Sequence, residues 1–332
     1  MASMHPTAER LRAILERQCI EKFGPDYLPA IRATRREAPS ISRPSQVFVA
    51  KLGRDVHLLS LPERAAGLLA SYHPRLFELH EQKMLSVGPH MHPLAGHPRA
   101  IGSKLMPVQG TVDVAERLGC LSFHPKVKVP RTAGNDGSMW VPYPYVGDLL
   151  LYLDDERGPY CVNWTVKSTF DAFEQPPPRN EPIRNMSAAL RRAQARHDIE
   201  RVYYNDAGIR TVRVAKTAIP DDLTLNLELL IGWHCKPVGM TPDQRAEVIA
   251  RIQTALELGL PPIGVFSQLM ARYRYAHEDL KAVFYQAIWN RQLRVDLFRP
   301  ILVDRPLRAE SRDVLQEFAH WFVRDECTSA SN

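Results

Sequence analysis

The clearest strand pattern in the chain is the run Asp148-Leu-Leu-Leu-Tyr-Leu-Asp-Asp-Glu-Arg-Gly-Pro-Tyr-Cys-Val-Asn-Trp-Thr-Val-Lys167. Two apolar segments of strand length flank a charged turn ending at Gly158, and this pattern predicts a β-hairpin. An acid opens the first strand and a lysine closes the second. Because side chains alternate along a strand, Asn163, Thr165 and Lys167 share one face of the second strand.

Strand and helix patterns alternate on both sides of this hairpin. The expected elements are strands at 46–51, 56–59, 76–81, 201–204 and 211–215, and helices at 8–18, 61–72, 112–118 and 186–197. This order predicts a mixed α/β domain over residues 1–216. Within that domain, residues 86–145 are rich in proline and glycine, which indicates an insertion or an elaborated surface loop.

The first 45 residues form a basic N-terminal arm. Residues 31–44 combine arginines with turn-forming residues, so we expect an extended segment there. Two interpretations fit it equally well: a solvated linker, or an arm that lies along the phosphates of a nucleic acid. In the second interpretation Arg35 and Arg36 contact the phosphates.

Residues 217–332 have a mainly helical pattern. Helices are expected at 221–233, from the capping box at Thr241 and Gln244 onward, at 265–275 and at 278–290. Residues 293–303 alternate as a β-ribbon does, and a terminal helix at 309–324 would pack back on this domain. Three short helices closed by a ribbon describe a winged helix, which binds DNA about as often as it docks proteins.

The composition is that of a globular protein with room for two cores. The 332 residues are 45% hydrophobic and 24% charged, and no apolar run approaches the roughly 18 to 20 residues of a membrane span. The N-terminus lacks the apolar core of a signal peptide, and five scattered cysteines contain no Cys-x-x-Cys pair. We therefore expect a cytoplasmic protein without disulfides, and its net charge of +6 permits nucleic-acid binding.

Glu63, Asp148 and Lys167 form the candidate catalytic set. Two carboxylates can hold Mg²⁺, which would lower the pKa of an attacking water at a scissile phosphate, and a nearby lysine can stabilise the charged transition state. An acid on a helix and an acid and a lysine on a hairpin are the arrangement of the restriction-endonuclease (PD-(D/E)xK-type) fold. Simpler interpretations exist: Glu63 can cap its helix through Ser60, Asp148 can be a turn residue, and Lys167 a solvated strand end.

Three stretches resemble the TnsA family, the endonuclease subunits of heteromeric cut-and-paste transposases. They are Gly24-Pro-Asp-Tyr-Leu-Pro29, Leu52-Gly-Arg-Asp-Val-His-Leu-Leu-Ser-Leu-Pro-Glu63 and Leu76-Phe-Glu-Leu-His-Glu-Gln82. The similarity covers residues 18–85 well and the hairpin more loosely, and residues 86–145 have no clear counterpart. It implies a restriction-endonuclease-like domain at 1–216 followed by a winged-helix domain at 217–332.

The resemblance also implies a catalytic site. Glu63 takes the position of the helix acid, Asp148 that of the strand acid and Lys167 that of the lysine. The family hairpin ends Gln-x-Lys, whereas this chain has Thr165 at the glutamine position, and Asn163 on the same face could supply an amide instead. Glu63, Asp148 and Thr165 are therefore the expected ligands of one or two Mg²⁺ ions, with Mn²⁺ as a substitute.

The family further implies partners in the bacterial cytoplasm and no membrane association. TnsA-like subunits nick the 5′ ends of the transposon, an integrase-type transposase cuts the 3′ ends, and an AAA+ ATPase regulator docks on the C-terminal domain. From charge alone, Arg191, Arg192 and Arg196 are candidates for contacts with the DNA backbone, with a solvated helix face as the alternative. Two other functions stay open: a DNA- and partner-binding subunit with a weakened site, and a free-standing restriction-type nuclease.

Overall fold

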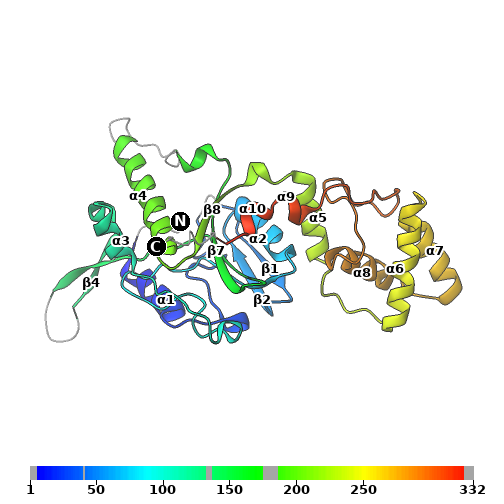
Figure 1. Cartoon of the computed structure of the whole chain (residues 1–332), viewed down its shortest axis with the longest axis horizontal. Coiled ribbons are helices and arrows are strands. Elements are labelled where there is room, and N and C mark those ends of the chain that lie inside the picture. The colour runs from blue at the N-terminus through cyan, green and yellow to red at the C-terminus, as the bar shows by residue number, and fades with distance from the viewer. Residues whose placement is uncertain (1–5, 40–41, 132–136, 175–185, 325–332) are drawn as a thin grey trace, which may run out of the picture. The chain divides into compact units, whose positions relative to one another are not determined.

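A computed structural model describes residues 6–39, 42–131, 137–174 and 186–324 (Figure 1). The proline-rich stretch 175–179 and Cys327 lie outside these ranges. Contacts divide the chain into two compact units: unit 1 is Met1–Gly67, Arg75–Ala218 and Trp321–Asn332, and unit 2 is Leu68–Pro74 and Ile219–His320. Among the described residues no helix is long and apolar enough to cross a membrane.

A four-stranded mixed sheet forms the centre of unit 1. Its strands lie in the order β3 (Leu76–Glu81), β6 (Leu149–Asp155), β7 (Gly158–Lys167) and β8 (Arg210–Ala215). The first three run antiparallel to their neighbours, and β7 and β8 are parallel. Parallel neighbours need a long crossover, which helix α4 (Met186–Asn205) supplies here. The expected hairpin and the mixed α/β class are confirmed.

Both faces of this sheet are buried. Leu150 and Tyr152 of β6 belong to the same buried cluster as Ile199 and Tyr203 of α4. On the other face, Trp164 is fully buried, and its indole N–H donates to the main-chain carbonyl of residue 321 at 2.8 Å. The apolar run of the hairpin therefore reflects burial on two sides, as expected for an internal strand.

The strand expected at 201–204 is wrong, because α4 continues to Asn205. Its aromatic and β-branched residues favoured a strand, but Ala195, Ile199 and Tyr203 repeat at a spacing of four and are all buried. Tertiary packing of this helical face outweighs local strand propensity.

The N-terminal elements agree closely with the expectations. Helix α1 (Ala8–Gln18) is followed by the hairpin of β1 (Ser45–Val49) and β2 (Arg54–Leu58), and then by helix α2 (Leu61–Tyr72). Strand β3 has the bounds that the sequence pattern predicted. Short 3-10 helices occur at Gly24–Asp26, Pro98–Ala100, Leu121–Phe123, Asp171–Phe173 and Lys216–Ala218.

The extended arm expected at 31–44 is not extended where it is described. Ala33 and Ala38 are buried, and the Ala33 N–H donates to Nδ1 of His57 at 3.1 Å. Glu37 accepts two hydrogen bonds from the Arg17 guanidinium, at 2.7 and 2.9 Å. Small alanines allow the segment to fold against its neighbours.

The insertion at 86–145 contains elements that the sequence concealed in part. Helix α3 (Thr111–Arg117) was expected, but the antiparallel ribbon of β4 (Lys126–Pro130) and β5 (Ser138–Pro142) was not. Each strand of the ribbon ends in a proline, and prolines normally argue against a strand. At the end of a two-stranded ribbon the missing N–H removes little pairing, so the prolines are tolerated.

Unit 2 is mainly helical, as expected. It contains α5 (Asp221–Ile231), α6 (Pro242–Glu257), α7 (Pro262–Tyr273) and α8 (His277–Trp289). The capping box at the start of α6 is present, since the Gln244 N–H donates to Thr241 Oγ1 and the Thr241 N–H donates to Gln244 Oε1. Leu280, Phe284 and Ile288 of α8 are buried at helical spacing.

The β-ribbon expected at 293–303 is wrong. The described segment after α8 has a single bridge, between Val295 and Ala309, and otherwise irregular backbone. Asn226 of α5 takes the place of a strand partner: its Nδ2 donates to the carbonyls of Leu297 and Arg299, and its Oδ1 accepts from the Ile301 N–H. A side chain thus satisfies backbone groups that a ribbon would have paired.

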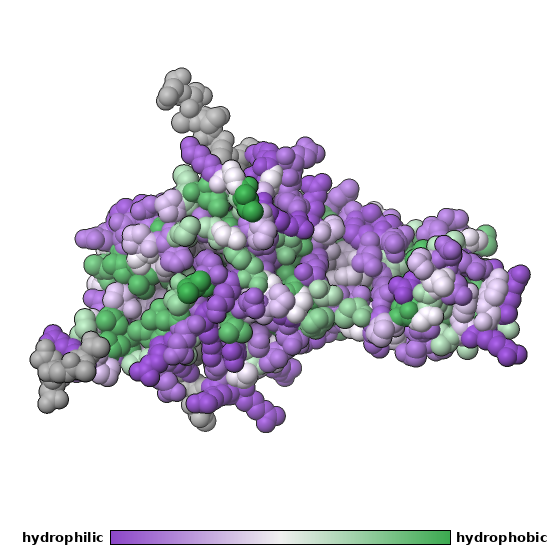
Figure 2. Space-filling view, turned by 90° about the horizontal axis from the view of Figure 1, so that it is seen from below, coloured by the Kyte–Doolittle hydropathy of each residue, from purple (hydrophilic) through white to green (hydrophobic). Residues whose placement is uncertain are grey.

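The terminal helix expected at 309–324 is also wrong. Two short helices, α9 (Val314–Glu317) and α10 (Ala319–Phe322), replace it. Trp321 and Phe322 pack against Trp164 of β7, with ring centroids 5.8 and 5.0 Å apart, and not on the C-terminal helices as expected. On the face shown in Figure 2, hydrophobic residues form separate patches among hydrophilic ones.

Candidate active site

Glu63 lies in the first turn of α2 and is only 8% exposed. Its Oε1 accepts from the Ser60 hydroxyl at 2.8 Å, and its own N–H donates to Ser60 Oγ at 3.3 Å, so the capping contact allowed by the sequence is present. Its Oε2 accepts from the Leu59 N–H at 2.9 Å. Glu63 can therefore cap its helix and also take part in a functional site.

Gln82 connects the end of β3 to both candidate acids. Its side-chain Nε2 donates to Glu63 Oε2 at 2.9 Å, and its main-chain N–H donates to the Asp148 carbonyl at 3.0 Å. Its φ is +51°, in the left-handed region that non-glycine residues seldom occupy. Strain of this kind concentrates at functional sites, where the surrounding structure holds it in place.

Asp148 lies immediately before β6, at the end of the sheet where β7 finishes. Its Oδ2 accepts from the Val166 N–H at 2.7 Å, which fixes the carboxylate beside the last residues of β7. Lys167 is the final residue of that strand. Among the described residues neither Asp148 nor Lys167 takes part in an ion pair.

The charges of these three residues act on one another. Burial, followed by the negative charge of Asp148, raises the pKa of Glu63 to about 7, and the positive charge of Lys167 opposes this shift. Such effects require the three charges to lie within electrostatic reach. An acid poised near neutral pH beside a second acid is a common feature of functional sites.

Glu200 is a further acid beside the site, buried like Glu63, that the sequence analysis missed. It lies on α4, and its Oε1 accepts from Asn163 Nδ2 at 3.0 Å and from the Thr165 hydroxyl at 3.2 Å. Burial is the main cause of its raised pKa, and the charge of Asp148 adds to it. Because the sequence analysis placed a strand at 201–204, Glu200 stood outside any predicted element. On a continuous helix Glu200 lies four residues after Arg196 and therefore on the same face, and this spacing could have revealed it as a candidate.

Asn163 and Thr165 both face α4, as the alternation along β7 predicted. Thr165 is 3% exposed and Asn163 is 1% exposed, and each donates a hydrogen bond to Glu200. The role of Thr165 as a metal ligand stays a prediction. The carboxylate of Glu200 offers a harder, charged oxygen donor at the same face of β7.

Arg196 and His197 of α4 complete the surroundings. Arg196 donates to the Val146 carbonyl at 3.0 Å, and its charge acts on Glu200. Burial, followed by the charge of Lys167, lowers the pKa of His197 to about 4, so this ring is neutral at pH 7. Arg196 thus places a positive charge beside Glu200, and His197 a neutral ring near Lys167.

The remaining predicted DNA contacts lie on exposed surface. Arg191 and Arg192 are exposed on α4, and Arg35 and Arg36 are exposed in the turn after α1. Arg36 approaches Glu9 at 3.8 Å with both side chains almost fully exposed, which adds little stability. These four residues are available to a polyanion, and their role stays a prediction.

The residues that carried the resemblance gather in one buried network beside the site. Both oxygens of Glu81 accept from the Arg54 guanidinium at 2.9 Å. The Tyr27 hydroxyl donates to the Glu81 carbonyl at 2.7 Å, and the Arg54 guanidinium lies 4.7 Å from the Tyr27 ring centroid. This network, which we call the arginine network, fixes the strand that ends at Gln82.

The donor chemistry of the site fits a hard divalent cation. Glu63, Asp148 and Glu200 provide carboxylate oxygens, and Mg²⁺ typically takes one or two of these and keeps several waters. The structure shows no group of three His, Cys, Asp or Glu residues at metal-binding spacing within its described ranges. A cation there would use a sparse protein ligand set completed by water and phosphate oxygens, as Mg²⁺ does at phosphoryl groups.

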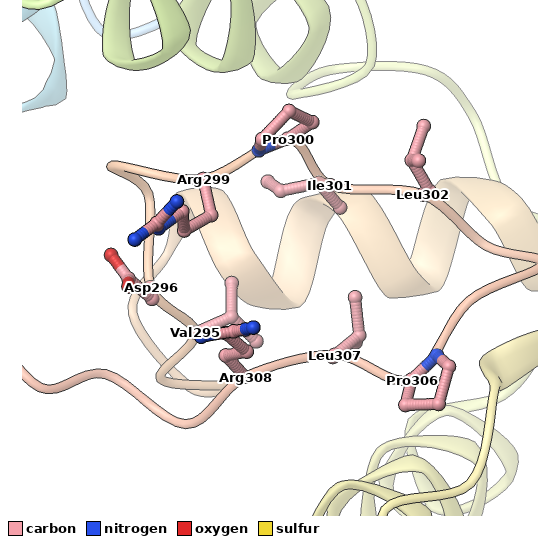
Figure 3. A pocket seen from close by; sticks show the side chains of 9 residues that line it. All are labelled: Val295, Asp296, Arg299, Pro300, Ile301, Leu302, Pro306, Leu307 and Arg308. Carbon is pink, nitrogen blue, oxygen red and sulfur yellow. The ribbon is translucent and has the colours of Figure 1, made fainter.

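A pocket of about 230 Å³ lies within unit 2 (Figure 3). Its walls include Val295, Ile301 and Leu307, and Arg299 and Arg308 are the basic residues that line it. Asp296 is the acid among its lining residues, so it holds no pair of carboxylates. It is not the candidate catalytic site.

No protein-family model matches this chain, and no curated protein is significantly similar to it. The functional argument consequently depends on the residues described above.

Proposed function

We propose that this protein is a Mg²⁺-dependent DNA endonuclease of the restriction-endonuclease-like fold. The observation that carries the proposal is the set of acids around the end of the β6–β7 hairpin: Glu63 and Glu200 are buried, Asp148 is half-buried, and Lys167 lies within electrostatic reach. Burying acids without a cation is costly. A metal ion bound by the site would recover that cost.

The residues would divide the work as follows. Glu63 and Asp148 would hold Mg²⁺, with Thr165 or Glu200 beside them, and the bound ion supplies an activated water and charge neutralisation at a phosphodiester. The ammonium group of Lys167 stabilises negative charge that develops on the phosphate oxygens. Neutral His197 adds no competing charge, and Arg196 and the exposed arginines of α4 hold the DNA backbone.

The biological setting follows from the resemblance. We propose that the chain nicks the 5′ ends of a transposon beside an integrase-type transposase, and that residues 217–332, in whose described part a single bridge stands where a wing was expected, form a helical domain that docks an AAA+ ATPase regulator. Support comes from the mixed α/β sheet with a helical C-terminal part and from the clustering of the quoted motifs around Glu81 and Gln82.

Two measurements test the proposal. Calorimetric titration of Mg²⁺ into the full chain should show binding that Asp148→Asn removes. A 5′-end nicking assay on labelled transposon-end DNA, with the integrase-type subunit present, should show Mg²⁺-dependent cleavage by the wild type and none by Asp148→Asn. Metal binding that survives Asp148→Asn would remove Asp148 from the site.

A second candidate is a DNA- and partner-binding subunit whose nuclease site has weakened. It is favoured by the hydrogen bond from Thr165 to Glu200, which engages the hydroxyl at the position where the family has glutamine. This candidate predicts neither Mg²⁺ binding nor nicking. A free-standing restriction-type nuclease would instead cut both strands at a specific sequence without any partner.

A further inference from the structure

The β4–β5 ribbon projects from unit 1 (Figure 1). Its pairing register gives it two faces with different side chains. Val127 pairs with Val141, and Val127 is only 4% exposed, so this face rests on the body of the unit. On the opposite face Lys128 pairs with Trp140, because cross-strand partners project to the same side. The second face is exposed at Lys128 and Trp140.

The open face combines positive charge with an exposed aromatic ring. Lys126 and Lys128 are exposed, and Trp140 is 65% exposed. An exposed tryptophan needs a reason, because burying it would remove a large apolar area from water. Lysines beside an exposed aromatic ring are the side chains that contact nucleic acid through phosphates and through sugars or bases.

The charge around the ribbon is one-sided. Between positions 118 and 147 the sequence holds Lys126, Lys128 and Arg131 and a single acid, Asp136. The chain as a whole is far more balanced, with 43 basic and 37 acidic residues. A segment with more basic than acidic residues fits a polyanion better than a basic partner.

We propose that the β4–β5 ribbon is a DNA-binding arm that lies in a groove of duplex DNA. A two-stranded ribbon fits the major groove, whose width is about 12 Å. Lys126 and Lys128 contact phosphates of the groove wall, and Trp140 packs on the deoxyribose or base edges between them. This inference rests on the proposed function in one respect: it takes duplex DNA as the partner.

The test is a binding measurement that does not involve cleavage. A fluorescein-labelled duplex of about 30 bp, roughly three helical turns, is titrated with the full chain in EDTA over a range of salt concentrations, and its anisotropy is followed. Lys126→Gln/Lys128→Gln should weaken binding about tenfold or more at about 0.1 M salt and reduce the slope of log K against log salt by about 2. Trp140→Ala should weaken binding about fivefold with an unchanged slope, and Trp140→Phe should restore most of it.

Lys104→Gln/Arg305→Gln is the matched control. Both residues are exposed and lie outside the ribbon, and the two substitutions remove the same amount of charge as the ribbon variant. An equal loss in the control would overturn the proposal, since bulk charge alone would then explain binding. Unchanged affinity and slope in the ribbon variant, with unchanged circular dichroism and Tm, would also overturn it. Wild-type DNA binding without Mg²⁺-dependent nicking in the assay that contains the integrase-type subunit would refute the catalytic proposal and leave the ribbon result intact.

Discussion

Two neighbouring sets of acids in unit 1 have opposite kinds of partner. In the arginine network, both oxygens of Glu81 contact a guanidinium, and Glu78 approaches the same Arg54 at 3.9 Å. In the candidate active site and within the described residues, the donors to Glu63 are all neutral, and Asp148 forms no ion pair. The first set is paired with a guanidinium of the protein, whereas we propose that the second set takes a cation from outside.

Gln82 connects the two sets. It follows Glu81 in the chain, and its amide contacts Glu63. The left-handed backbone at Gln82 turns the chain between them. The difference between the sets therefore suggests how to tell structural acids from functional ones: by the charge of the partners, and not by burial.

The largest expected effect belongs to Asp148. Asp148→Asn should lower Mg²⁺-dependent nicking about a thousandfold or more, because it removes a charged ligand while preserving the size of the side chain. The free energy of unfolding, measured by urea denaturation without metal, should hardly fall. A variant that is equally active, or that fails to fold, would place Asp148 among the structural acids.

The matched change in the arginine network should behave in the reverse manner. Glu81→Ala leaves the buried Arg54 without its partner and should cost about 3–5 kcal/mol of folding stability, as measured by urea denaturation. The double variant Arg54→Met/Glu81→Leu removes both charges and should recover much of this loss. A negligible loss in Glu81→Ala would show that the pair is not what stabilises β3.

Addition of Mg²⁺ should stabilise the protein through the second set only. At a concentration about one hundred times the Kd, binding adds about 2.7 kcal/mol to the free energy of unfolding, so Tm should rise. Asp148→Asn should abolish the shift, and Arg54→Met/Glu81→Leu should keep it. Equal shifts in wild type and Asp148→Asn would indicate that the ion binds elsewhere.

The pH dependence follows from the raised pKa of Glu63. Since its folded pKa of about 7 exceeds the ordinary carboxyl value of 4.5, the folded state binds the proton more tightly. The metal-free protein should therefore lose stability as pH rises from about 4.5 to about 7 and level off above. Mg²⁺ binding needs the ionised form, so its affinity should rise about tenfold from about pH 6 to about pH 8.

Glu63→Gln provides the control for this titration. It should flatten the stability change over that pH interval, because glutamine does not ionise. Calorimetric titration at three pH values, below, at and above the pKa of Glu63, gives the affinity series for the wild type. An affinity that is constant over this series would assign the poised proton to another group.

The smallest expected effect concerns Thr165. Thr165→Val removes one hydrogen bond to the buried Glu200 and should cost about 1 kcal/mol of stability in urea denaturation. Thr165→Ser retains the hydroxyl and should lose less. If Thr165→Val abolishes Mg²⁺ binding at the same time, the hydroxyl is a ligand, and if binding persists, Glu200 holds the site without it.

The sequence predicted the parts of the fold whose local pattern agrees with their packing. The hairpin and β3 have strong strand patterns, and α2 has a regular apolar face, so their positions were evident. The error at 201–204 arose because Tyr203 and Tyr204 have strand propensity but pack as helical residues. The ribbon expected at 293–303 failed because Asn226, distant in sequence, supplies the hydrogen bonds.

The candidate site was predictable to a similar extent. Glu63, Asp148 and Lys167 stand out because acids and a lysine occur at the ends of recognisable elements. Glu200 and Gln82 contact them only in three dimensions, since Glu200 comes from a helix beyond the hairpin and Gln82 acts through its unusual backbone. Alternation of side chains placed Asn163 and Thr165 on the correct face, but it could not name the acid that they contact.

The packing of residues 321 and 322 over Trp164 has a consequence for biosynthesis. The main-chain carbonyl that accepts its indole hydrogen and the ring that shields it belong to residues 321 and 322, which the ribosome makes well over a hundred residues after the strand. A nascent chain stopped at position 320 would leave this tryptophan exposed. Full burial of this face of the sheet therefore waits for translation to pass that point, so an unfinished polypeptide carries a sheet that is open on one side.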